Sequence, residues 1–474
     1  MNRRHIEDIL PLTPMQESML YQYLRKPEGK LYFEQNCYQL TGDVEVSRIK
    51  GAWNRVAAAN EMLRIVFRWQ RLKRPVQIVL KNLSIPVKEV NLSQLNDETQ
   101  QQELFRIKEE DRQKIIDLTV QPFRVILCKL EKNKSEMIVT NHHILFDGWS
   151  NVILLKEFFE AYHMLSRRTP AVMPVKNRFK EYIKWQQNQD KIKQKNYWKK
   201  LLQGFKGTVS LAARQNRNST RGNHRNEYYE YPLPGDLQKK IMDFSKHKAV
   251  TPAVIFYSAW ALLLYKYCQA ADVIFGITLS GRNSQIKVMQ DMVGLFINTL
   301  PFRVKIDTGA AIEDFLRDVG SSLIQVEEFQ STSLTDIISY SERDPREALF
   351  DSVVVIQNYP VDKILYQGGN QLSISLTTRF YKTDIDIALG IRTFEGIILE
   401  FAYNPDIFAE NVVREFLGYF TAVVRKMVLP GKAGIRIKDI LDPEQKERQR
   451  IHLNLREDRN RLNEIDEVNT DEIF

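Results

Sequence analysis

Cysteine is scarce in this chain: it has three among 474 residues, Cys37, Cys128 and Cys268, with no zinc-like or redox-like spacing. An odd count without a framework argues against disulfides and indicates buried thiols in a reducing compartment. No window contains the roughly 18 apolar residues that a membrane-spanning helix needs. The first residues are basic and lead into Ile6-Glu7-Asp8 rather than an apolar run, so no secretory signal is visible. These absences predict a cytoplasmic protein.

Basic charge is nowhere concentrated. Lysine and arginine number 68 against 59 acidic residues, which leaves a formal net charge of +9. The basic residues are scattered over expected helix faces and a polar loop at 215–226, without the interleaved aromatics of a single-strand nucleic-acid platform. This distribution argues against nucleic-acid binding and is typical of a solvated surface. Attraction to acidic partner proteins is the functional alternative, because opposite charge raises association rates.

The most informative segment is residues 141–150, which read Asn-His-His-Ile-Leu-Phe-Asp-Gly-Trp-Ser. It follows an apolar, β-branched run at 137–140 that predicts a strand. Asp147-Gly148 is a turn signal, and Ser150 is a favourable helix N-cap. An apolar stripe at helical spacing follows: Val152, Leu154, Leu155, Phe158, Phe159, Tyr162 and Leu165. The sequence therefore predicts strand, tight loop and helix, with two imidazoles at the strand end and a carboxylate in the loop.

Neighbouring side chains on a strand point to opposite faces, so His142 and His143 cannot share one pocket while the strand lasts. A metal site is not expected, since adjacent strand histidines chelate poorly and no third ligand lies at a familiar spacing. One imidazole is therefore assigned to chemistry and the other to structure. A neutral imidazole can accept a proton from an attacking amine or hydroxyl. Asp147 has two open roles, a second acid or base and an anchor for the loop.

The length of the chain and the position of its prolines predict two halves and a tail. A chain of 474 residues exceeds the usual size of one domain. Proline near residues 170–174 marks the boundary between residues 1–175 and residues 176–455. Residues 456–474 alternate acidic with single apolar residues and cannot build a core. A disordered linker is favoured there over a docking tail that would use Leu462, Ile465, Val468, Ile473 and Phe474.

Both halves mix helices with strands. Helices are predicted at 46–60, 100–118, 180–202, 237–244, 253–267, 312–325 and 409–427, besides the one after Ser150. Strands are predicted at 32–40, 123–130, 136–145, 273–279, 353–357, 385–391 and 397–403, the last two paired across 393–396. Each half is therefore expected to be an α/β sandwich.

The chain resembles, along nearly its whole length, the condensation domains of nonribosomal peptide synthetases. The His-His-x-x-x-Asp-Gly pattern at 142–148 is the signature of that family. The other similar blocks, in the order of the family, are 12–20, 59–67, 179–186, 197–198, 293–301, 349–356 and 403–408. Asn60 replaces the usual histidine of the second block and Ile65 a common threonine, but Arg64 is kept. Phe329 stands where many relatives have histidine, which bears on subtype and partner contacts more than on chemistry.

The resemblance implies both a fold and a reaction. The implied fold is α/β, with two chloramphenicol acetyltransferase-like sandwich halves arranged as a V-shaped pseudo-dimer with a tunnel between them. The implied reaction is the amide bond formation of nonribosomal peptide, antibiotic or hybrid polyketide biosynthesis: a carrier-bound aminoacyl amine attacks a carrier-bound acyl or peptidyl thioester. The protein would be a monomer without a cofactor of its own, because donor and acceptor carrier proteins deliver the phosphopantetheine arms. An adjacent adenylation domain or docking partner is also implied.

The resemblance assigns the chemistry to His143 and leaves His142 to structure. It implies an ion pair between Asp147 and Arg64, which makes Asp147 a poor acid and favours the anchoring role. Gly148 permits close approach of the backbone, and its N–H is expected to face the developing oxyanion. The expected residues of the substrate tunnel are Asn298, Gly294, Gln357 and Trp149. A buried amide that caps a strand end is an equal alternative for Asn298, and packing is favoured for Trp149.

Other functions share parts of this pattern. An acyltransferase that uses acyl-coenzyme A shares the His-x-x-x-Asp-Gly logic, but the block at 293–301 and the length of two halves favour carrier-bound substrates. An epimerisation domain would need an additional acidic or tyrosine base in the second half, and none is identified. A non-catalytic platform that recruits carrier proteins typically has a damaged His-His block, which is intact here.

Overall fold

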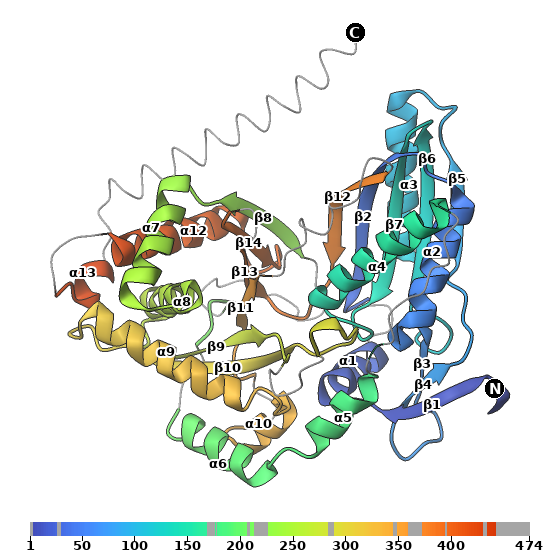
Figure 1. Cartoon of the computed structure of the whole chain (residues 1–474). Coiled ribbons are helices and arrows are strands. Elements are labelled where there is room, and N and C mark those ends of the chain that lie inside the picture. Colours follow the sequence, from blue (N-terminus) through green and yellow to red (C-terminus); the bar gives the residue numbers. More distant parts are fainter. Residues whose placement is uncertain are drawn as a thin grey trace.

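The computed structural model describes residues 3–25, 30–167, 176, 178–205, 209–212, 226–282, 289–344, 348–358, 372–393, 396–429 and 434–441. In Figure 1 these residues form two lobes that meet at one end and diverge toward the other, as the arms of a V. Each lobe combines a mixed sheet with helices, as the sequence predicts. The expected tail at 456–474 lies outside the described residues.

The first half is built on a five-stranded sheet of order β12-β2-β7-β6-β5. Side chains of β7 alternate between two apolar layers: Met137 and Val139 pack in the cluster that includes α2 and α4, and Ile138 packs with the apolar residues of α3. Helices therefore cover both faces, which explains why β7 is buried almost throughout. The main elements are β2 (Phe33–Gly42), α2 (Val46–Ala59), β5 (Val87–Asn91), α3 (Asp97–Gln113), β6 (Phe123–Glu131), β7 (Lys134–His142) and α4 (Gly148–Ser166).

A smaller antiparallel sheet of order β1-β4-β3 lies near the point of the V (Figure 1). It carries the block that contains Arg64, since the short helix η3 (Glu61–Arg64) runs directly into β3. The elements of this region are η1 (Arg3–His5), β1 (Ile6–Pro11), α1 (Pro14–Arg25), β3 (Ile65–Arg68) and β4 (Val76–Leu80).

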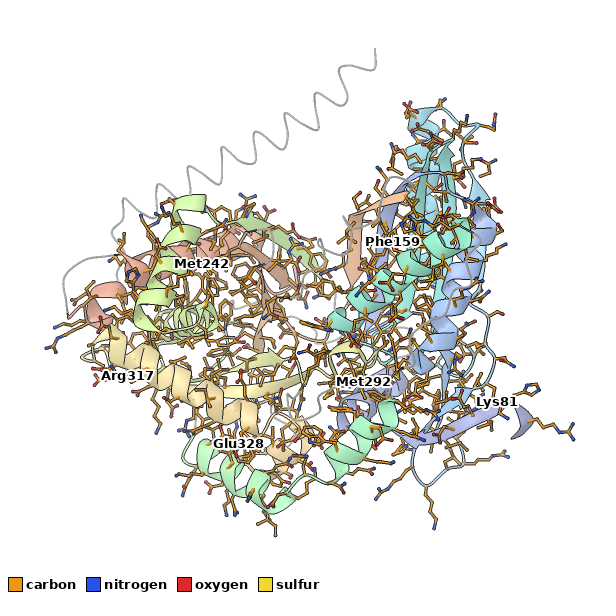
Figure 2. All side chains as sticks on the ribbon, in the orientation of Figure 1. Lys81, Phe159, Met242, Met292, Arg317 and Glu328 are labelled. Atoms are coloured by element: carbon orange, nitrogen blue, oxygen red, sulfur yellow. The ribbon has the colours of Figure 1, made fainter. Side chains whose placement is uncertain are left out.

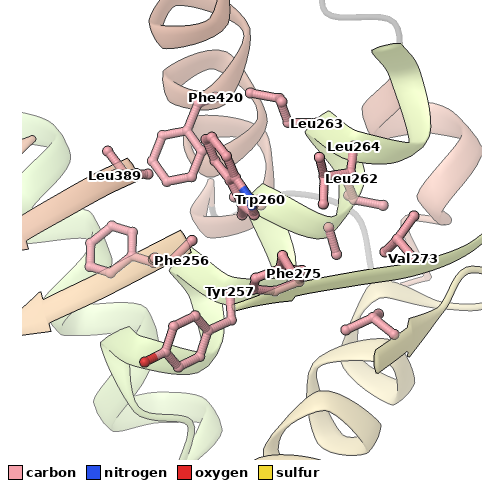
Figure 3. Packing of buried hydrophobic residues seen from close by; sticks show 14 of the residues in the cluster. Phe256, Tyr257, Trp260, Leu262, Leu263, Leu264, Val273, Phe275, Leu389 and Phe420 are labelled. Carbon is pink, nitrogen blue, oxygen red and sulfur yellow. The ribbon is translucent and has the colours of Figure 1, made fainter. Parts of the chain in front are cut away.

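The second half is built on a six-stranded sheet of order β10-β9-β11-β13-β14-β8. Its central helix α8 is apolar nearly all round; Figure 3 shows Phe256 and Trp260 of this helix among Phe275, Leu389 and Phe420 from β9, β13 and α12. The strands are β8 (Glu227–Pro232), β9 (Asp272–Leu279), β10 (Asn298–Lys305), β11 (Ser352–Gln357), β13 (Ile387–Arg392) and β14 (Ile398–Tyr403). The helices are α7 (Gly235–Lys248), α8 (Pro252–Cys268), η5 (Met289–Asp291), α9 (Ile312–Glu328), α10 (Leu334–Tyr340), α12 (Glu410–Val428) and α13 (Ile437–Leu441).

The single helix predicted at 180–202 is wrong, because the structure has two. Helix α5 (Phe179–Gln187) ends before Asn188, and α6 (Lys191–Leu202) begins after Asp190. The Asp190 side chain accepts hydrogen bonds from the backbone N–H groups of Ile192 and Lys193, so it is the N-cap of a new helix. The break lets α5 pack on the core of the first half and α6 on that of the second.

Segments later than residue 175 also enter the first half. Strand β12 (Leu372–Tyr381) pairs antiparallel with β2, with Tyr381 opposite Glu34. The apolar residues of 289–296 and of α5 belong to the first core; Figure 2 shows Met292, one of them, where the lobes meet. Most elements before residue 175 belong to the first half and most later ones to the second, but these segments follow residue 175 and still pack in the first half.

A polar contact joins the two sheets at β12. The Tyr381 hydroxyl donates to Glu400 Oε1 at 3.0 Å, and the Tyr228 hydroxyl donates to the Tyr381 carbonyl. Glu400 lies on β14 and Tyr228 on β8, so β12 is bound to the second sheet while it extends the first. Burial raises the pKa of Glu400, Arg379 opposes that shift, and the hydrogen bond with Glu230 adds to it.

Among the described helices, no single one is both long and apolar enough to cross a membrane. Helices α7 and α8 pass that test only as a pair bent by 109°. Ten of the eleven buried residues of α8 belong to the apolar core of the second half.

Candidate active site

His142 is the last residue of β7, and its ring is enclosed by protein. The residue is 2% exposed, its Nδ1 accepts the backbone N–H of Ile144 at 3.1 Å, and its ring meets that of Tyr23 edge-on at 5.7 Å. Burial, helped by the neighbouring His143, lowers the pKa of His142 to about 3. The ring is therefore neutral across the physiological range and packs as part of the core, as its expected structural role requires.

His143 follows β7 and is held by two carbonyl groups. Its backbone N–H donates to the Tyr32 carbonyl at 2.8 Å, and its Nδ1 lies 2.7 Å from the Phe146 carbonyl. A carbonyl can only accept, so Nδ1 carries the proton and the neutral ring has its lone pair on Nε2. The side chain is 20% exposed. The structure thus presents a basic nitrogen of fixed tautomer outside the core.

Glu34, on β2, is the carboxylate beside this nitrogen. Its Oε1 lies 3.7 Å from His143 Nε2, and its Oε2 accepts from Asn141 Nδ2 at 3.1 Å. No local pattern in the sequence points to Glu34, because 109 positions separate it from His143.

No sequence pattern points to Tyr32 either, and its backbone has an unusual conformation. Its φ of 63° lies in the left-handed region, which costs a bulky residue on the order of 1–3 kcal/mol. Hydrogen bonds hold it on both sides: its N–H donates to the Lys382 carbonyl at 2.7 Å, and its carbonyl receives the N–H of His143. The strained residue thus connects the end of β12 to the histidine.

Asp147 is the N-cap of α4 and is completely buried. One carboxylate oxygen accepts from Ser150 N at 2.9 Å and the other from Phe296 N at 3.1 Å. Arg282 Nη2 approaches Oδ1 at 3.5 Å; the two side chains are 0% and 6% exposed. These contacts join the motif loop to the segment that precedes β10, which supports the anchoring role over an acid or base.

The expected ion pair between Asp147 and Arg64 is wrong. Arg64 instead pairs with Glu7 at 2.5 Å and donates to the carbonyl groups of Ala57, at 2.9 Å, and Leu80. Its position at the end of η3 directs the guanidinium to the small sheet. Arg64 therefore supports that sheet, and Arg282 is the partner of Asp147.

Arg282 organises the contact between the halves. It donates to Ser150 Oγ at 2.9 Å and to the carbonyl of Met292 at 3.1 Å, and it lies over the Phe296 ring at 4.4 Å. Burial lowers the pKa of Arg282, and the Asp147 carboxylate opposes that shift.

Gly294 is part of this contact. Its N–H and carbonyl both bond Ser150 Oγ, at 3.0 and 2.9 Å, and its carbonyl accepts from Asp147 N at 3.2 Å. A Cβ here would lie 2.5 Å from the Phe179 ring. Only glycine allows this approach, so Gly294 has a packing role at the junction, and its place on a substrate tunnel stays a prediction.

The remaining predicted residues lie nearby but are not all directed at His143. Asn298 Nδ2 donates to the carbonyl groups of Gln330 and Thr332 at 2.8 and 2.7 Å, which fits the amide that caps a strand end. Trp149 Nε1 donates to the Gln290 carbonyl at 3.2 Å, so it packs across the junction as favoured. Gly148 is the partly exposed first residue of α4, and Gln357 ends β11, half-buried. Contact of these two with substrate stays a prediction.

In the part of the chain that the structure describes, no group of three or more His, Cys, Asp or Glu side chains could hold a metal ion.

Sequence relatives cover almost the whole chain. The family described as Condensation domain matches residues 6–449. One of the linear gramicidin synthase proteins of Brevibacillus parabrevis is 30% identical over 453 residues, which are 94% of this chain and 6% of that protein. Surfactin synthase subunit 3 of Bacillus subtilis (strain 168) is 27% identical over 449 residues, 94% of this chain and 35% of that protein. The chain therefore spans only a part of these relatives.

Solved structures show the same fold at low identity. The X-domain from teicoplanin biosynthesis aligns with a TM-score of 0.76 at 18% identity, over 93% of this chain and 98% of that one. The first condensation domain of the CDA synthetase aligns with a TM-score of 0.71 at 14% identity, over 91% of this chain and 98% of that one. Holo-AB3403, a four-domain nonribosomal peptide synthetase, aligns with a TM-score of 0.75 at 15% identity, over 93% of this chain and 34% of that one. The predicted α/β fold with two chloramphenicol acetyltransferase-like halves is confirmed.

Proposed function

The chain belongs to the condensation-domain family of nonribosomal peptide synthetases, and we propose that it joins two carrier-bound substrates through an amide bond. The amine of an aminoacyl group attacks the carbonyl carbon of an acyl or peptidyl thioester. A C–N bond forms and the C–S bond breaks. The proton that the amine loses passes to His143 and then to the departing thiolate, so the histidine ends the cycle neutral.

The observation that carries this proposal is the setting of His143. Donation from Nδ1 to the Phe146 carbonyl leaves the lone pair on Nε2, and the ring is partly exposed. His142, one residue earlier, is buried and has its pKa lowered to about 3. Of the two imidazoles, His143 is thus the one that a substrate amine can reach.

The location of His143 supports reactants that arrive from two carriers. Asp147 and Ser150, which follow His143 in the same loop, bind Phe296 and Arg282; Tyr381 of β12, which is opposite Glu34, binds Glu400 of the second half. His143 is therefore close to contacts that join the lobes. Sites between halves are common locations for ligands, and we propose that phosphopantetheine arms reach it through a passage there.

Magnitudes favour positioning as the main contribution. Attack of an amine on a thioester is downhill, and orienting two bound reactants supplies on the order of 7–11 kcal/mol. General-base assistance adds about 10²–10⁴-fold. The chain needs no cofactor of its own for this reaction. Because it spans 6% and 35% of the two relatives, we propose that carrier and adenylation domains act beside it.

A platform that only binds a partner is the second candidate. The X-domain from teicoplanin biosynthesis aligns as well as the condensation domains do, and one solved structure, at a TM-score of 0.77, is its complex with OxyB. Epimerisation receives less support. Its two acid–base groups must flank one carbon atom from opposite sides, whereas Glu34 lies only 3.7 Å from His143 Nε2.

Intact masses of two loaded carrier proteins separate these functions. One carrier bears an acyl or peptidyl donor and the other an aminoacyl acceptor, and the chain is added at catalytic concentration. Condensation moves the donor mass to the acceptor carrier. Unchanged masses with measurable binding indicate a platform, and deuterium uptake at Cα indicates epimerisation. Either of the last two results would overturn the proposal.

A further inference from the structure

Glu34 is a half-buried carboxylate beside the basic nitrogen of His143. Register places it opposite Asn141 on β7 and Tyr381 on β12, on the face of the sheet that α4 covers. The same face carries Tyr38, whose hydroxyl accepts from Asn151 of α4 at 3.1 Å. The Glu34 side chain is 23% exposed, as partly accessible as His143.

The contacts of Glu34 leave one oxygen directed at the site. Asn141 binds Oε2 at 3.1 Å and fixes the carboxylate, while Oε1 stands 3.7 Å from His143 Nε2. That separation is beyond a hydrogen bond between the two. Oε1 is therefore not occupied by a bond from Nε2.

We propose that Glu34 binds the attacking amine together with His143. Two acceptors 3.7 Å apart can both contact one nitrogen at ordinary hydrogen-bond lengths of about 2.9 Å. An amine offers enough N–H groups for both. This inference rests on the proposed function and adds a recognition element for the acceptor.

The chemistry of the attack gives this second contact a role. When the neutral amine forms the C–N bond, its nitrogen becomes positively charged and has two protons. His143 Nε2 takes one of them, while Glu34 Oε1 accepts a hydrogen bond from the other N–H and stabilises the charge until that transfer. The proton then reaches the thiolate released from the broken C–S bond. A hydroxyl nucleophile has a single proton and would leave Glu34 without a donor.

The alternative is that Glu34 only pairs the strands through Asn141. The two roles differ in what the Glu34→Gln variant changes. Glutamine keeps the size and can keep the bond to Asn141, but it loses the negative charge. A structural role therefore predicts equal effects on acceptors with and without an amine, whereas an amine-binding role predicts an effect on the amine alone.

The test measures binding without turnover. A carrier protein bears glycyl-pantetheine through a non-reactive amide in place of the thioester, and a second bears the acetyl analogue, which differs only in the amine. Titration calorimetry gives both dissociation constants for the wild type, Glu34→Gln and a control, Glu131→Gln. Glu131 ends β6 at the other end of the same sheet and is 64% exposed.

The wild type and Glu131→Gln should bind the glycyl carrier about 10- to 100-fold more tightly than the acetyl carrier, the range of a charge-assisted hydrogen bond. In Glu34→Gln the two constants should become nearly equal, with acetyl binding unchanged. An unchanged ratio, or equal weakening of both carriers, overturns the inference. Absence of mass transfer by the wild type would instead overturn the proposed function, and the binding ratios would still decide the role of Glu34.

Discussion

Asp147 and Arg282 lie 3.5 Å apart across the junction of the two halves, although 135 residues separate them in the chain. Both side chains are buried, and each also binds the N-terminal turn of α4 through Ser150. The motif loop is thereby held by a segment from the other half of the chain. The carboxylate of the motif thus holds the loop in position, and the proposed chemistry falls to the imidazole of His143.

Double-mutant cycles can distinguish the observed pair of Asp147 with Arg282 from the expected pair of Asp147 with Arg64. Asp147→Ala should lower the free energy of unfolding by about 3–5 kcal/mol and reduce soluble yield, because it leaves a buried guanidinium without its partner. When Asp147→Ala is combined with Arg282→Leu, the cycle measured by urea denaturation should give a coupling energy of about 0.5–3 kcal/mol. With Arg64→Leu the effects should add within about 0.5 kcal/mol. Coupling to Arg64 and none to Arg282 would contradict the geometry.

His143→Ala should slow donor transfer by about 10²–10⁴-fold while the fold persists. The control is His247→Ala, since His247 Nδ1 also lies 2.7 Å from a backbone carbonyl but is exposed on α7. Rates come from intact carrier masses and stability from thermal unfolding. A His143→Ala protein that transfers the donor at the wild-type rate would end the proposal for this residue.

Gly294→Ala should destabilise the junction by about 1–3 kcal/mol, because the new Cβ would lie 2.5 Å from the Phe179 ring. Gly235→Ala is the matched control, since its Cβ would meet nothing within 4 Å. Adding Phe179→Leu should recover part of the loss. Urea denaturation measures all three, and equal stability of the two glycine variants would refute the packing role.

Glu400 should make stability depend on pH. Burial raises its pKa in the folded protein above the ordinary 4.5, so the folded state holds a proton that the unfolded chain has released. Protonation of Glu400 therefore stabilises the folded protein below about pH 4.5. This stabilisation is lost as the pH rises through the pKa of Glu400 in the folded state. The free energy of unfolding of Glu400→Gln, minus that of the wild type, should increase over this range and then level off. Glu131→Gln should show a flat difference, and a flat line for Glu400→Gln as well would contradict the assignment.

Local patterns in the sequence predicted much of the site. The apolar run before His142 and the stripe after Ser150 correspond to β7 and α4, and the alternation of side chains separated the two imidazoles correctly. These features depend on neighbours within a few positions, which periodicity reports directly. The hairpin of β13 and β14 was predicted on the same basis.

The errors concern contacts between distant positions. The expected partner of Asp147 was an arginine from the same half, and the structure replaces it with Arg282. The predicted helix at 180–202 is broken because its two parts pack on different cores. Neither the strand exchange of β12 nor the approach of Glu34 to His143 leaves a periodic signal in the chain.

The sequence by itself therefore determined most of the secondary elements and the family, and it predicted which of the two imidazoles is left outside the core. Only the tertiary structure decided which polar side chains lie together: Arg282 with Asp147, and Glu34 with His143. Periodicity records which face of an element is apolar, and it carries no information on the partner that covers this face. That choice is made when the two halves pack, because a buried charge is stable only where an opposite charge or hydrogen-bonding groups meet it.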